Sequence, residues 1–288
     1  MQLSSSETNL GGDGWLGNMA MDVSREITKR IADGWFHKLK WSLSAWNDSQ
    51  QVAIRDMRAF LLVARDEIFA LNDLDQRRVK HEQWTYSLNQ ALMGKSHSDA
   101  AAAIAETANR FEVPRSFFHE ALTAIESNLF RERLVNNNDL LRLAYRQTGT
   151  FMLSAAKIAD LYEPLHRDYF LCLGIGVGVL DVIMDWQHWE KTNWLPIPLD
   201  WVKEVSGAEA ALRQGDWRKP LKISSRVRRT LLPSLVRRMA TLGIETLTQA
   251  KPTSAVQDSR WYADFAQWTE QSLDQLHDVF SSPEKLLG

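Results

Sequence analysis

Residues 173–196, LGIGVGVLDVIMDWQHWEKTNWLP, decide the fold of this chain. The segment is apolar for about three helical turns and then carries Asp181, Asp185 and His188 before it ends at Pro196. Positions four and seven apart share one face of an α-helix, so the two carboxylates and the imidazole are predicted to point the same way. Burial of two carboxylates costs several kcal/mol unless a positive group compensates them, and Mg²⁺ is a natural candidate. The alternative is a solvated helix end whose acids face water.

The rest of the chain repeats apolar residues at helical spacing. Residues 52–74 are predicted to form one long helix, and a second runs from residue 165 to about residue 189. A third passes through residues 145–159, with Asp139 or a preceding Asn as its cap. Because no alternating strand pattern or Asn-Gly hairpin stands out, the sequence predicts an all-α protein built around a large central cavity or core.

The composition limits both the organisation and the class of protein. Residues 1–17 are rich in Ser, Gly and Asn and are predicted to be a disordered leader, with residues 18–288 forming a single domain. The net charge of −2 argues against a nucleic-acid partner. No secretory signal is visible, no apolar run reaches the roughly 18–20 residues of a membrane span, and Cys172 is the single cysteine. These features favour a cytoplasmic protein.

A basic cluster surrounds a short apolar segment in the C-terminal third of the chain. Its members are Arg226, Arg228, Arg229, Arg237 and Arg238. Charge runs of this kind are usually a solvated helix face. The alternative is peripheral contact with an anionic membrane surface, where lipophilic substrates are found.

A second acidic cluster lies on the predicted helix over residues 52–74. Asp66 and Glu67 are adjacent, and Asp73, seven residues after Asp66, is predicted to share its face. Mg²⁺ usually binds through a few carboxylates together with phosphate oxygens of a substrate. If the two long helices face each other, their acids could therefore hold Mg²⁺ against a diphosphate.

Three segments together resemble the squalene/phytoene synthase family, the head-to-head prenyl synthases. Residues 61–73, LLVARDEIFALND, are similar to the first aspartate motif of the family, and residues 173–196 are similar to the second. Residues 128–159 look like the segment with a Tyr-rich helix and an Ala-Gly-Thr, which stands here as Thr148-Gly149-Thr150. The resemblance covers roughly residues 41–248. It implies an isoprenoid synthase-type helical bundle around a central apolar cavity, which ionises a prenyl diphosphate substrate with Mg²⁺.

The resemblance also implies roles for individual residues. The metal ligands would be Asp66, Glu67, Asp181 and Asp185. Substrate contacts would come from Arg65, Tyr145, Arg146, Gly149, Trp186 and Trp189. The catalytic residues would be Asp66, Asp185 and His188. His188 would be either a general base, because the pKa of histidine lies near neutrality, or a plain polar contact. Trp186 or Trp189 would face a carbocation, since only one of them can share the face of Asp185.

Several positions depart from the family pattern. Ala70 stands where the closing aspartate of the first motif is expected, and His188 and Trp189 stand where acids follow in the second. Val63 and Met184 replace the arginines that bind diphosphate, although Arg65 and Arg146 lie close by. Asp181 stands where an asparagine is usual, and Asn128 where an acid is common.

Two interpretations follow from the match and its departures. The first is a divergent prenyltransferase or terpene synthase that couples prenyl units, cyclises one, or prenylates another acceptor. The second is a catalytically inactive scaffold or assembly factor that keeps the fold, because fold alone does not imply function. The four surviving acids favour the enzyme. A small-molecule carrier has no separate support in the sequence.

Overall fold

The computed structural model describes residues 29–95, 98–130, 133–192, 194–204, 229 and 231–287. These residues form helices and their connections, and no strand occurs among them. After a helical segment over residues 29–39, the elements are α2 (Asp48–Phe69), α3 (Leu74–Leu92), α4 (Asp99–Arg110), α5 (Arg115–Leu129), α6 (Asn137–Ala144), the π-helical η1 (Tyr145–Gly149), α7 (Thr150–Ile158), α8 (Pro164–Met184), α9 (Trp186–Lys191), α10 (Leu199–Lys203), α13 (Leu232–Gln249), α14 (Ser254–Gln257), α15 (Tyr262–Ser281) and α16 (Glu284–Leu287). The predicted leader, Arg226 and Arg228 lie outside the described residues.

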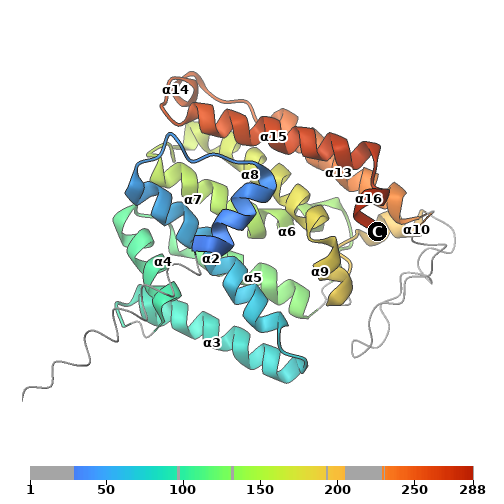
Figure 1. Ribbon diagram of the computed structural model, residues 1–288, viewed down its shortest axis with the longest axis horizontal. Coiled ribbons are helices and arrows are strands. Elements are labelled where there is room, and N and C mark those ends of the chain that lie inside the picture. Colours follow the sequence, from blue (N-terminus) through green and yellow to red (C-terminus); the bar gives the residue numbers. More distant parts are fainter. Residues whose placement is uncertain are drawn as a thin grey trace, which may run out of the picture.

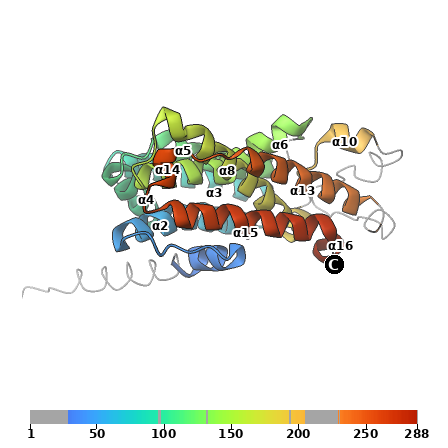
Figure 2. The ribbon, with the colours of Figure 1, turned by 90° about the horizontal axis from the view of Figure 1, so that it is seen from above.

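Helix α8 lies at the centre of the bundle (Figure 1). It contacts α6, η1, α7, α13 and α15, and α13 and α15 run along one side of the molecule (Figure 2). On the other side α2 packs against α3, α4, α5 and α7. The acidic end of α8 and the helix that carries Asp66 therefore belong to one packed unit, as the sequence predicts for an all-α domain.

Glycine allows α8 to approach its neighbours closely. A Cβ atom at Gly178 would lie 2.4 Å from the carbonyl oxygen of Ala144, and one at Gly174 would lie 2.7 Å from the Cα of Gly149. Real side chains do not tolerate such distances, so α8 and the α6–η1 segment can touch through their backbones only because these positions lack a side chain. This contact sets the position of the acidic end of α8.

Two predicted helices end earlier than their apolar periodicity suggests. Helix α2 stops at Phe69, and the Asp73 carboxylate caps α3 by accepting hydrogen bonds from the backbone N–H groups of Asp75 and Gln76, both at 3.0 Å. The prediction that Asp73 shares a helix face with Asp66 is therefore wrong, because aspartate at this position caps a new helix. Likewise α8 ends at Met184 and α9 begins after Asp185.

The predicted helix through residues 145–159 forms, but with a π-helical turn in it. Asn136 caps α6 by accepting from Asn138 and Asp139, so an asparagine is the cap and Asp139 is not. The turn η1 then interrupts the α-helical register before α7. Such π-helical turns occur often at functional sites, and this one carries Thr148 to the buried end of α8.

Tryptophans build much of the core, where their large rings pack against one another. Trp41 stacks on Trp268 with ring centroids 4.6 Å apart, and Trp35 packs edge-on against Trp41 at 5.0 Å. Among the described residues, no helix combines the length and apolar character that a membrane crossing requires.

Candidate functional site

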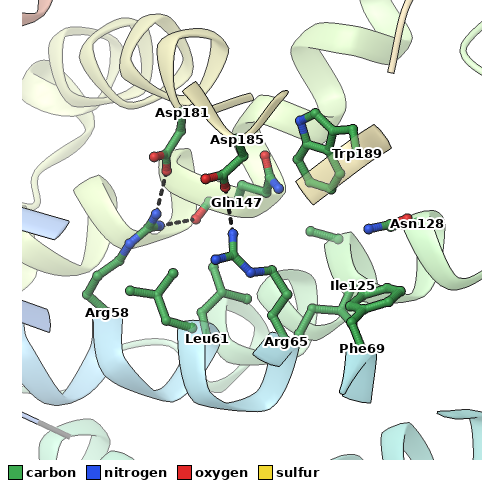
Figure 3. Close-up of a pocket in the computed structure, with 12 residues that line it drawn as sticks. Arg58, Leu61, Arg65, Phe69, Ile125, Asn128, Gln147, Asp181, Asp185 and Trp189 are labelled. Atoms are coloured by element: carbon green, nitrogen blue, oxygen red, sulfur yellow. Dashed lines mark hydrogen bonds and ion pairs between the residues drawn. The ribbon is translucent and has the colours of Figure 1, made fainter. Parts of the chain in front are cut away.

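The two acidic residues at the end of α8 face two arginines on α2. Arg58 and Arg65 lie seven residues apart on one face of α2, and they point toward Asp181 and Asp185 respectively (Figure 3). A cavity of about 10 Å³ lies among α2, α5, η1 and the end of α8. This volume suits one water molecule.

Asp181 is the most enclosed acid of the site, with 3% of its surface exposed. Its carboxylate accepts hydrogen bonds from Arg58 Nη2 at 2.5 Å, from Trp35 Nε1 at 2.8 Å and from Thr148 Oγ1 at 2.9 Å. The guanidinium of Arg58 also lies 3.9 Å from the centre of the Trp35 ring, which stabilises its charge. Three segments of the chain thus meet α8 at one buried carboxylate.

Burial lowers the pKa of Arg58, and the charge of Asp181 offsets this only in part. Arginine stays protonated in proteins even when its pKa is lowered. Arg58 and Asp181 therefore form a buried ion pair, and the positive group that compensates Asp181 belongs to the chain itself.

Asp185 is held at the edge of the same site by two cations. Arg65 Nη1 donates to its carboxylate at 2.6 Å, and Lys38 Nζ lies 3.4 Å from its other oxygen. Burial alone would raise the pKa of Asp185, but the charges of Arg65 and Lys38 outweigh burial and hold that pKa below its ordinary value. Arg65 also contacts Asp66 at 3.3 Å, so this acid lies nearby but outside the enclosed part.

Glu67 is directed away from the other predicted metal ligands. Its carboxylate lies 2.8 Å from Lys80 Nζ and accepts a hydrogen bond from Trp84 Nε1 at 3.2 Å, both on α3. The structure therefore brings Asp181 and Asp185 together, leaves Asp66 at the rim, and separates Glu67 from the set. Within the described ranges, no group of three or more His, Cys, Asp or Glu side chains could hold a metal ion.

These residues do not fit the Mg²⁺ that the resemblance implies. Mg²⁺ requires oxygen ligands close to octahedral positions. The carboxylate oxygens of Asp181 and Asp185 instead accept hydrogen bonds from arginine, lysine, tryptophan and threonine. The positive charge predicted to lie between the two acids is present, but it is supplied by guanidinium groups.

His188 is a neutral imidazole in this environment. Burial, with a smaller effect of the Arg65 charge, lowers its pKa to about 3. Its Nε2 lies 3.1 Å from Asn128 Nδ2, and its ring meets Phe69 edge-on at 5.0 Å. The prediction of a pKa near neutrality is therefore wrong, and an imidazole of such low basicity is poorly suited to act as a general base.

The depressed pKa of His188 predicts a specific loss of stability in acid. Between pH 6.5 and about 3 the unfolded state binds a proton that the folded state does not, so the free energy of unfolding falls as the pH falls through this window. The slope of the free energy of unfolding against pH reaches at most about 1.4 kcal/mol per pH unit. Urea unfolding of the wild type and of His188→Gln at several values between about pH 7 and about pH 4 measures how the free energy of unfolding changes with pH. Parallel curves for the two proteins would contradict the assignment.

The remaining predicted substrate contacts are divided between the cavity and other places. Trp189 lines the cavity, whereas the Trp186 indole donates to Glu190 at 2.9 Å. Arg146 pairs with Glu120 at 2.9 Å. Tyr145, Arg146 and Gly149 are not among the residues that line this cavity.

Sequence reasoning missed four residues that form ion pairs or hydrogen bonds with the two acids. They are Arg58, Lys38, Trp35 and Thr148. Arg58 carried a usable signal, because it interrupts the apolar face of α2 four residues after Ile54 and seven before Arg65. Charged residues on a buried helix face are normally paired. Trp35 and Lys38 carried no comparable signal.

The described part of the basic cluster is engaged in contacts within the protein. Arg237 donates to the carbonyl of Phe280 at 3.1 Å. Arg238 pairs with Glu204 and lies 4.8 Å from the ring centre of Trp201. Both contacts lie at the surface, where the Arg238 side chain is 43% exposed, as on a solvated helix face.

Comparisons with known proteins agree with this architecture. Residues 41–263 match the sequence profile of the family described as squalene/phytoene synthase. The squalene synthase HpnC from Alicyclobacillus acidocaldarius has a similar structure, with a TM-score of 0.69 at 12% identity over 92% of this chain and 95% of that one. A dehydrosqualene synthase in complex with ligand superposes with a TM-score of 0.66 at 14% identity, over 92% and 87% of the two chains. No curated protein matches the sequence. The match spans far more than half of the chain, and the chain therefore belongs to the squalene/phytoene synthase family, a family of prenyltransferase-type synthases.

Proposed function

We propose that this chain is a non-catalytic member of its family, a scaffold or assembly factor that keeps the synthase fold. One observation carries the proposal. The carboxylates of the second acidic motif, Asp181 and Asp185, are paired with Arg58 and Arg65 where the resemblance implies metal-bound diphosphate. The inner pair, Arg58 and Asp181, is buried and forms part of the structural core.

The charge balance of the site supports this proposal. Three positive groups, Lys38, Arg58 and Arg65, contact three negative groups, Asp66, Asp181 and Asp185. Because these charges cancel, a bound diphosphate would bring negative charge without compensation. Mg²⁺ would have to compete with these hydrogen-bond donors for the carboxylate oxygens of Asp181 and Asp185.

The expected result is that the purified protein releases no diphosphate from farnesyl or geranylgeranyl diphosphate. The assay contains Mg²⁺ and is run beside an active family member as a positive control. A thermal melt gives an independent measurement, in which Mg²⁺ or EDTA should shift Tm by less than about 1 °C, since a ligand that does not bind the folded state does not stabilise it. Mg²⁺-dependent release that Asp185→Ala abolishes would contradict the proposal.

A divergent prenyl-diphosphate-using synthase is the second candidate. Family membership and the rim of the site favour it, because Arg65 lies between Asp185 and Asp66, and the Asp66 side chain is 61% exposed. For this candidate, Arg65 would exchange a carboxylate for a substrate phosphate. This candidate requires that the wild type release diphosphate. Arg65→Ala should abolish this release, and the unrelated surface variant Arg142→Ala should retain it.

A further inference from the structure

Two buried carboxamide groups line the cavity among α2, α5, η1 and the end of α8, and their oxygens have no partner in the protein. In the described part of the chain, three buried carboxamide oxygens lack a hydrogen-bond partner. Two of these, Asn128 Oδ1 and Gln147 Oε1, belong to residues that line this cavity. Both residues are buried, with 3% and 9% of their surface exposed, and Figure 3 shows both among the side chains around the cavity.

The two carboxamides are held where they lie. Asn128 Nδ2 lies 3.1 Å from His188 Nε2. Gln147 belongs to η1, which packs against α5, α6, α7 and α8, and its backbone carbonyl accepts a hydrogen bond from Arg58 Nη1 at 3.3 Å. Buried carbonyl oxygens are nearly always satisfied by the protein or by ordered water, because an unpaired oxygen has lost its hydration without compensation. The donor for these two oxygens is therefore expected to come from a bound molecule.

The size and the charge of the cavity select water as that molecule. A volume of about 10 Å³ accommodates a single water. Arg58 and Arg65 line the cavity, so a cation of similar size would be repelled, and the carboxamide and carboxylate oxygens around it would repel an anion. A neutral molecule with two O–H donors satisfies both oxygens. Arg58 Nε, which is also buried without a partner in the described part of the chain, provides a donor for the oxygen of such a molecule.

We propose that this cavity is a hydration site, in which one resident water molecule donates hydrogen bonds to Gln147 Oε1 and Asn128 Oδ1. The water joins η1, which carries Gln147, to α5, which carries Asn128. Buried waters that make about three hydrogen bonds are part of a protein's structure and are costly to remove. The inner part of the site is thus held together by a solvent molecule as well as by the ion pairs of Asp181 and Asp185.

Magnetic relaxation dispersion of the water ¹⁷O nucleus tests the proposal, because it counts the waters that stay in a protein longer than the protein takes to tumble. The double variant Asn128→Leu with Gln147→Met removes both acceptors with little change of volume, and it should hold one long-lived water fewer than the wild type. The matched control is Gln50→Met, which replaces a buried glutamine whose amide bonds within the protein, to Ile158 and Arg260 among others. This control should keep the wild-type count. Equal counts for the wild type and the double variant would overturn the proposal.

The stability of Gln147→Met alone gives a second test, which depends on the sign of the effect. If water satisfies Gln147 Oε1, the substitution removes a hydrogen bond, and the equilibrium constant for unfolding should rise about two- to tenfold. If the oxygen were unpaired, an apolar side chain of similar volume would be more stable in its place. Urea unfolding measures the change, and a stabilised Gln147→Met would overturn the proposal. This inference does not depend on the proposed function, because both measurements are made without substrate or metal.

Discussion

Replacing Asp181 with alanine is expected to destabilise the fold by about 3–5 kcal/mol. The substitution leaves the Arg58 guanidinium buried without its counter-charge, and it removes the acceptor for Trp35 and Thr148. A buried unpaired charge is among the most costly defects a point mutation can create. Urea unfolding followed by circular dichroism, with a common slope for both proteins, measures the change.

Two further variants separate this effect from the loss of any acid near the site. Asp66→Ala removes an exposed carboxylate that also contacts an arginine, and it should change stability by no more than about 0.5 kcal/mol. The double variant Arg58→Met with Asp181→Leu removes both charges and should recover most of the loss, because apolar replacement of a buried ion pair is often neutral. If Asp181→Ala were as mild as Asp66→Ala, the buried pair would not hold the structure together.

Gly178→Ala is expected to cost about 3 kcal/mol, the upper end for an added methyl group in a packed core. The new Cβ would lie 2.4 Å from the carbonyl oxygen of Ala144 and 2.8 Å from its carbonyl carbon. These are backbone atoms, which cannot move aside as a flexible side chain can, so α6 and α8 must separate. The midpoint of urea unfolding should fall accordingly.

Gly34→Ala is the matched control for this prediction. Gly34 also lies inside a helical segment, but a Cβ at that position would meet no atom within 4 Å. Alanine loses less conformational freedom than glycine on folding, so this variant should gain about 0.5–1 kcal/mol. Equal effects of the two substitutions would show that helix propensity, rather than the close approach of α8 to α6, controls the stability at Gly178.

Local signals in the sequence were sufficient for the fold. Apolar spacing predicted the helices, and three short segments indicated the family that the comparisons confirm. Of the two caps that the sequence left open before α6, Asp139 or an asparagine, the structure has the asparagine. Helix ends were less well predicted, because the apolar repeat continues past Phe69 while the Asp73 cap begins a new helix. Periodicity reports which face of a helix is buried, but a cap is a competing local interaction that periodicity does not register.

The sequence by itself determined that two acids lie at the end of an apolar helix, and that a positive charge must compensate them if they are buried, because a carboxylate cannot be buried alone. It left open whether they face water instead. Only the tertiary structure decided what supplies that charge. Arg58 and Arg65 lie 123 and 120 residues from their partners in the chain, and Trp35 lies 146 residues from Asp181. Their contact depends on how α2, α8 and the segment over residues 29–39 pack, and the strength of an ion pair depends on distance and burial, neither of which a local pattern contains.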